Sequence, residues 1–197
     1  MNCTLVRAAV ILGGLAWALT LGACATPSVH PIYTAADTPL IEPGLVGTWK
    51  QSGDKETYTI TRAGDGYHML VKNNEASGAK QWEFSVRLVK LGDSSFADIA
   101  AVEEERQAHE EHWGTLFVPT HMFVEWTLEK DTLTVRMLKR AWLQSALADE
   151  KITLGHTRLD ASTILITADT GDLQAFLKAH AKDDAAFGDV VNLERMK

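Results

Sequence analysis

Cysteine is scarce in this sequence: there are two, Cys3 and Cys24, and both lie within the first 24 residues. No thiol remains from Ala25 onward, which excludes disulfide bonds, thiol catalysis and cysteine-ligated metal sites in that part of the chain. The remaining length is ordinary for one domain and can bury a substantial interior. The folded part must therefore be stabilised by its hydrophobic core alone.

Basic residues are also fewer than acidic ones. The chain has 19 Lys and Arg against 26 Asp and Glu, a formal net charge of −7 with neutral histidine. Nucleic acids and anionic membrane surfaces are bound through clusters of lysine and arginine. The acidic balance argues against nucleic acid and against anionic membrane surfaces as partners of the domain, and its simplest role is to keep the protein soluble.

Catalytic motifs are missing as well. The sequence contains no Gly-x-Ser-x-Gly elbow, no phosphate-binding glycine loop and no dinucleotide-binding fingerprint. The segment His109-Glu110-Glu111-His112 superficially resembles a zinc motif, but its histidines are three residues apart and would need a third ligand such as His121. A solvated acidic segment explains the same residues. We therefore expect no cofactor and no enzymatic activity.

The first 23 residues carry the pattern of an export signal. Arg7 precedes an almost wholly apolar stretch over residues 8–21. A signal peptide has a basic start, an apolar core of roughly 7–15 residues and small residues at the cleavage site, whereas a membrane-spanning helix needs about 20 apolar residues. We predict that residues 1–23 form a signal peptide that is removed. An uncleaved anchor and an ordinary signal with an incidental cysteine are the alternatives.

The end of this signal, Leu21-Gly22-Ala23-Cys24, resembles the lipobox of bacterial lipoproteins. The resemblance implies that the Cys24 thiol takes a diacylglyceryl group, that a peptidase cuts before it, and that the new amine is acylated. Each buried acyl methylene contributes about 0.8 kcal/mol, so two or three chains would hold the protein on the membrane permanently. In that family an Asp after the cysteine retains the protein at the inner membrane. The residue here is Ala25, which implies an outer-membrane location facing the periplasm.

Proline is concentrated just after the lipobox, and only one proline lies elsewhere. Because proline cannot sustain a helix or a central strand, this stretch should be extended. We expect residues 24–43 to form the acylated cysteine and a flexible tether, and residues 44–197 to form a single domain. The four prolines of the tether are Pro27, Pro31, Pro39 and Pro43.

Alternating apolar and polar residues predict three β-hairpins in the first part of the domain. Their turns are expected at Gly64-Asp65-Gly66, at residues 92–95 and at Lys130-Asp131. In the second and third hairpins one face of the first strand is wholly apolar. These two faces consist of Trp82, Phe84, Val86 and Leu88, and of Met122, Val124, Trp126 and Leu128.

The second part of the domain mixes helices with strands. Apolar residues at helical spacing predict short helices over residues 141–150 and 173–180, the latter capped by Thr170. Another strand pair is expected over residues 152–167, and a closing strand over 190–195. About nine or ten short strands joined by tight turns favour a mainly β fold, an antiparallel up-and-down barrel, because closure removes exposed strand edges.

The start of the first strand, Gly47-Thr48-Trp49, resembles the Gly-x-Trp signature of the lipocalin-like (calycin) barrels. In that family the tryptophan closes the base of the barrel and an arginine late in the barrel packs over it; Arg195 is the match here. The chain is also similar to uncharacterised bacterial proteins, a resemblance that implies no activity. That second resemblance rests on the same Gly-x-Trp start and on Pro119, His121, Trp142, Leu143, Leu173, Gln174, Phe176 and Leu177.

Aromatic and Met side chains give the remaining functional indication. Inward side chains of a small barrel either fill its interior or line one small ligand cavity. Haem is disfavoured, because His68 and His121 fall on the outer faces of their strands. The residues that we expect at a ligand cavity are Trp82, Phe84, Met122 and Trp126.

Two functions fit these observations. The first is a non-catalytic module, anchored to the membrane through acyl chains on Cys24, that binds a small apolar or amphipathic ligand. The second is an envelope structural or interaction lipoprotein with a filled barrel that contacts a protein partner. An open apolar cavity would favour the first, and a packed interior with an exposed apolar patch would favour the second.

Overall fold

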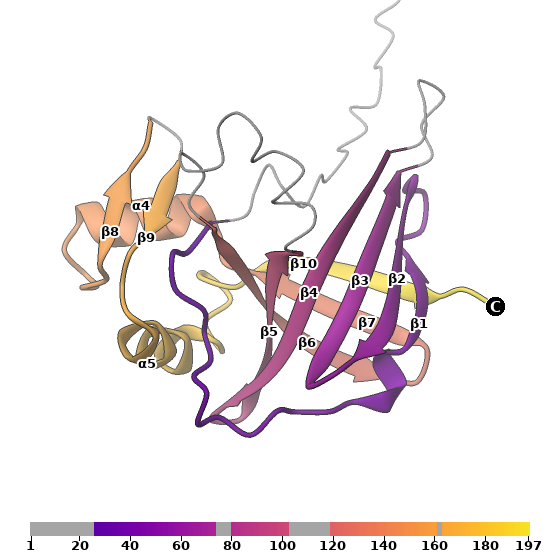
Figure 1. Ribbon diagram of the computed structural model, residues 1–197. Helices are drawn as coiled ribbons and strands as arrows, with labels where there is room; N and C mark the ends of the chain where they lie inside the picture. Colours follow the sequence, from indigo (N-terminus) through magenta and orange to yellow (C-terminus); the bar gives the residue numbers. More distant parts are fainter. Residues whose placement is uncertain (1–25, 74–79, 103–118, 161–162) are drawn as a thin grey trace, which may run out of the picture.

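The computed structural model describes residues 26–73, 80–102, 119–160 and 163–197, and its main feature is a closed antiparallel β-barrel (Figure 1). Eight strands form the barrel in the order β1-β10-β7-β6-β5-β4-β3-β2. The barrel fold predicted from the sequence is thus confirmed. The strands are β1 (Gly47–Lys50), β2 (Glu56–Ala63), β3 (Gly66–Asn73), β4 (Lys80–Leu91), β5 (Ser94–Ala101), β6 (His121–Glu129), β7 (Thr132–Met137) and β10 (Asp189–Arg195).

The three predicted hairpins are present as β2–β3, β4–β5 and β6–β7, each closed by a two-residue turn. Gly64 and Gly92 adopt φ values of 50° and 62°, which glycine reaches without the steric cost of a Cβ. These three turns lie at one end of the barrel, together with the 3-10 helix η1 (Pro43–Leu45). We call this end the base and the opposite one the upper end; they are at the bottom and top of Figure 1.

A long insertion separates β7 from β10. It contains α4 (Arg140–Ala148), the hairpin of β8 (His156–Arg158) with β9 (Ile164–Ile166), and α5 (Thr170–His180). All four elements were predicted, but the cap of α5 is Asp169, whose side chain accepts a hydrogen bond from the Asp172 N–H at 2.9 Å. None of the helices in the described residues is long and apolar enough to cross a bilayer.

The molecule has two hydrophobic cores on opposite faces of the same strands. One fills the barrel interior, and the other lies between the outer face of β4–β6 and the insertion, which sits beside the barrel in Figure 1. In the second core Phe96 of β5 meets Phe187 edge to face, with ring centroids 5.9 Å apart. Leu143 of α4 and Leu173 of α5 are fully buried there. The insertion therefore supports one wall of the barrel.

The segment before η1 packs against this body. Ser28 exchanges two backbone hydrogen bonds of 2.8 Å with His121 at the start of β6. Ile32 is fully buried in the second core, and its N–H donates to the Asp98 carboxylate at 2.9 Å. The prediction of a flexible tether over residues 24–43 therefore does not hold from Thr26 onward. Proline keeps this segment extended, as expected, but apolar burial and hydrogen bonds fix it in place.

This packing predicts a large effect of truncating Ile32. We expect Ile32→Ala to lower the free energy of unfolding by about 2–5 kcal/mol, because it leaves a cavity in a dense core. Ile41→Ala, in the same segment but 40% exposed, should change it by less than about 1 kcal/mol. Urea unfolding followed by tryptophan fluorescence measures both. Equal effects would mean that the segment is not docked in solution.

Candidate functional site

The base of the barrel is closed by a stacked pair of side chains. Trp49 is fully buried, and its indole N–H donates to the Leu45 carbonyl at 2.9 Å. The Arg195 guanidinium lies 4.2 Å from the centroid of the Trp49 ring. It also donates to the Val46 carbonyl at 2.8 Å and to the Asp131 carboxylate at 2.9 Å. The contact between Trp49 and Arg195, expected from the lipocalin-like resemblance, is confirmed.

Gly47 explains the first position of the Gly-x-Trp pattern. Its φ is 149°, in the region that favours glycine. A Cβ built there would lie 2.4 Å from Nη1 of Arg195, closer than any real contact. Any larger residue would push the guanidinium away from Trp49. The Gly-x-Trp pattern is therefore a requirement of the same closure.

Helix η1 completes the base from below. The Glu42 side chain caps it by accepting from the Gly44 N–H at 3.0 Å. The Tyr67 hydroxyl accepts from the Glu42 N–H at 2.7 Å and donates to the Glu42 carbonyl at 3.0 Å. Leu45 is thereby held across the barrel floor, where it is 4% exposed. The interior is closed at this end.

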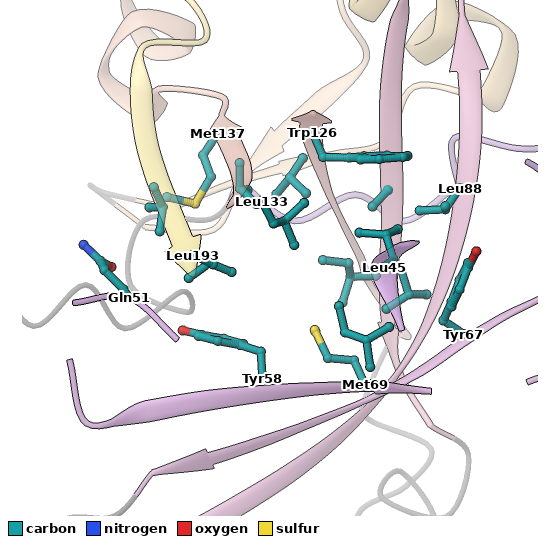
Figure 2. Close-up of a pocket in the computed structure, with 17 residues that line it drawn as sticks. Leu45, Gln51, Tyr58, Tyr67, Met69, Leu88, Trp126, Leu133, Met137 and Leu193 are labelled. Atoms are coloured by element: carbon teal, nitrogen blue, oxygen red, sulfur yellow. The ribbon is translucent and has the colours of Figure 1, made fainter. Parts of the chain in front are cut away.

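Above this floor the barrel encloses an apolar cavity of about 80 Å³. It runs from Leu45 at the base to Gln51, which follows β1 at the upper end. Figure 2 shows Met69 and Leu133 on opposite sides of this space, with the Tyr58 ring extending toward Leu193 and Gln51. The 17 lining residues are Leu45, Gln51, Tyr58, Ile60, Tyr67, Met69, Val86, Leu88, Ala97, Ile99, Val124, Trp126, Leu133, Val135, Met137, Val191 and Leu193.

The polar atoms of the cavity wall are few and mostly occupied. The Tyr58 hydroxyl donates to the Glu56 carboxylate at 2.8 Å. Burial, together with the negative charge and hydrogen bond of Glu56, raises the pKa of Tyr58, so its hydroxyl stays protonated. The Tyr67 hydroxyl is bound to the Glu42 backbone. The Trp126 indole N–H is buried without a hydrogen-bond partner in the described part of the chain. The wall therefore offers a ligand apolar contact above all.

Of the four residues predicted at a cavity, Trp126 lines it. Phe84 and Met122 pack against the barrel core without bordering the cavity. Trp82 is 39% exposed near the start of β4, where it pairs with Val71 at the upper end. Its prediction as a cavity residue is wrong, because alternation fixes which face a side chain takes and not its height along the barrel.

Several cavity residues were not singled out in the sequence. They come from all strands of the barrel except β1, and β2 and β3 supply Tyr58, Ile60, Tyr67 and Met69. The alternation of apolar and polar residues in these two strands could have identified them as inward-facing, since Tyr58 and Ile60 alternate with threonine. Which of the inward residues border open space depends on neighbours from distant strands.

The histidines examined as haem or metal ligands lie on outer faces. His68 Nε2 is 2.8 Å from a Glu83 carboxylate oxygen, and His121 Nδ1 is 2.6 Å from Asp98. His109 and His112 lie outside the described residues. Within the described ranges no three His, Cys, Asp or Glu side chains are grouped as a metal site would require.

Comparisons of the chain with protein-family models, with curated proteins and with solved structures found no match.

The closure of the base predicts that Arg195→Ala is strongly destabilising. It removes charge-assisted hydrogen bonds to Val46 and Asp131 and the stacking on Trp49. We expect a loss of about 2–4 kcal/mol in the free energy of unfolding. Arg158→Ala, at an exposed position of β8, is the control and should change it by less than about 0.5 kcal/mol. A matching small loss for both variants in urea unfolding would contradict the role of Arg195.

Proposed function

We propose that this protein is a lipid-anchored binding module of the outer membrane, facing the periplasm, that holds a small apolar or amphipathic ligand inside its barrel. The observation that supports the proposal is the apolar cavity between Leu45 and Gln51. A buried cavity with an almost wholly apolar wall favours hydrocarbon over a polar or charged molecule. The proposed activity is binding alone, with no chemical change of the ligand.

The size of the cavity restricts the ligand. About 80 Å³ is roughly half of the 150 Å³ of an engineered apolar cavity that takes up benzene. A slender group such as part of a single acyl chain fits this space better than a fused ring system. Met69 and Met137 line the cavity, and methionine adapts its shape more readily than branched side chains. A longer chain would be accommodated by movement of these two side chains.

The anchor and the family are parts of the same proposal. The lipobox resemblance at Cys24 supports membrane attachment, and the Ala25 that follows supports the outer membrane. The closed barrel and the Trp49–Arg195 contact support a relationship to lipocalin-like barrels. Cys24 lies outside the described residues, so its support comes from the sequence.

The modest cavity volume is the observation that favours the second candidate, an envelope structural or interaction lipoprotein that contacts a protein partner. Native and denaturing mass spectra of the mature protein distinguish the two. A discrete small-molecule mass that is lost on denaturation supports the binding module. A clean protein mass, unchanged after incubation with envelope lipid extract, would overturn it in favour of the interaction protein.

Filling the cavity should abolish binding without unfolding the barrel. Ala97 lines the cavity from β5, and Ala97→Leu places an isobutyl group there. We expect it to weaken binding of a fluorescent fatty acid about tenfold or more, because the isobutyl group occupies the ligand's space and forcing both into the barrel would cost about 1–3 kcal/mol in the complex. Ala63→Leu, at an exposed outer-face position near the base end of β2, should bind as the unmodified protein does. Equal affinities of the two variants would place the ligand outside the barrel.

A further inference from the structure

We propose that the upper end of the barrel faces the bilayer that holds the acyl chains of Cys24, so that a lipid ligand enters the cavity from the membrane itself. This inference rests on the proposed function and adds an orientation and a source of ligand to it. Two observations carry it: where the described chain begins and how short the link to Cys24 is.

The described chain begins at the upper end and is fixed there. Ser28 exchanges backbone hydrogen bonds with His121 at the start of β6. On its other side, the Val29 N–H donates to the Ile166 carbonyl and the Ile166 N–H donates to the Pro27 carbonyl, both at 2.9 Å. Thr26 is 5% exposed. Residues 26–29 are thus clamped between β6 and β9 and cannot lengthen the anchor.

The link from this clamp to the lipid-attachment site is short. Cys24 precedes Thr26 by two residues, which span at most about 7 Å when fully extended. The acyl chains must therefore enter the membrane within that distance of the upper end. A strand such as β3 has eight residues, and with the usual tilt of barrel strands it places the base roughly 20 Å away. The base would accordingly point away from the bilayer.

Apolar side chains are exposed at both ends of the barrel, with Ile41, Val46 and Met196 at the base, and those at the upper end are available to a membrane surface. Trp82, 39% exposed, lies near the start of β4, and Leu159, 58% exposed, follows β8. The β8–β9 hairpin extends toward the top of Figure 1, as the upper end of the barrel does. Tryptophan prefers the headgroup level of a bilayer, where its ring is partly buried and its N–H stays solvated.

The cavity gives this orientation a function. Its floor at the base is closed by Leu45, and at the other end it reaches Gln51. A ligand that enters at the upper end passes directly from the bilayer to the apolar wall. It avoids exposing its hydrocarbon to water on the way. The occupant of the upper end is therefore the phospholipid surface, and the ligand is a single-chain lipid taken from it.

The orientation can be measured with site-specific labels, because the mature chain has no thiol besides Cys24. Lys80→Cys at the upper end and Asp65→Cys at the base each receive a fluorophore in the full chain, processed in a two-membrane bacterium. The proteins are placed in vesicles of phosphatidylethanolamine and phosphatidylglycerol with nitroxide-labelled headgroups. We expect quenching at Lys80→Cys several times that at Asp65→Cys. Equal quenching, stronger quenching at Asp65→Cys, or a mass that shows no acyl group on Cys24 would overturn the proposal.

A spacer variant is the matched control. Inserting about 20 Gly and Ser residues between Ala25 and Thr26 gives the anchor a mean reach of roughly 25 Å. We expect the difference between the two labels to shrink, and uptake of a fluorescent fatty acid from the same vesicles to slow while the final amount bound stays equal. Unchanged uptake would overturn direct entry from the membrane. Failure of the proposed binding function is distinguishable, because then neither protein takes up the fatty acid although the labels still report orientation.

Discussion

The fold depends on the contact between Trp49 and Arg195 at the base of the barrel. It joins the first strand to the last, and the same guanidinium also holds the Asp131 turn and the backbone ahead of β1. The two residues are far apart in the sequence, with the whole barrel and the insertion between them. Contacts of that kind cost loop-closure entropy, so the closing interaction has to be strong. A stacked, multiply hydrogen-bonded guanidinium meets that need better than a single apolar contact would.

The same strands serve two cores, and this arrangement keeps the cavity open. The outer faces of β4–β6 pack against α4, α5 and the β8–β9 hairpin, which makes that wall rigid. The inner faces carry small or unbranched residues at several places, among them Ala97 and Met137. Packing of the insertion on the outer face of β4–β6 therefore holds these strands in position although the cavity on their inner face is not filled. The N-terminal segment adds to this wall through Ile32 and Asp98.

Polar groups are directed away from the interior. The rings of Tyr58 and Tyr67 line the cavity. Their hydroxyls make hydrogen bonds to Glu56 and to the Glu42 backbone. Neither hydroxyl is left to select a polar ligand, since a satisfied donor gains little from a second partner. Apart from the Trp126 indole N–H, which has no partner among the described residues, the cavity wall discriminates by shape and apolar contact. These properties agree with a slender hydrocarbon chain as the proposed ligand.

The sequence by itself determined the three hairpins and the barrel class, because alternation and turn residues act locally. The contact between Trp49 and Arg195 was expected only from the resemblance to lipocalin-like barrels, and the steric role of Gly47 came from the structure. The lipid anchor at Cys24 stays a prediction from the sequence. Only the tertiary structure decided that Trp82 stands at the upper end and that the segment before η1 packs against the body through Ser28 and Ile32. Alternation sets the face of a side chain, but its height along the barrel and its burial depend on neighbours from distant strands. The prolines indicated an extended segment, and the surface that received Ile32 exists only once the insertion has packed against the barrel.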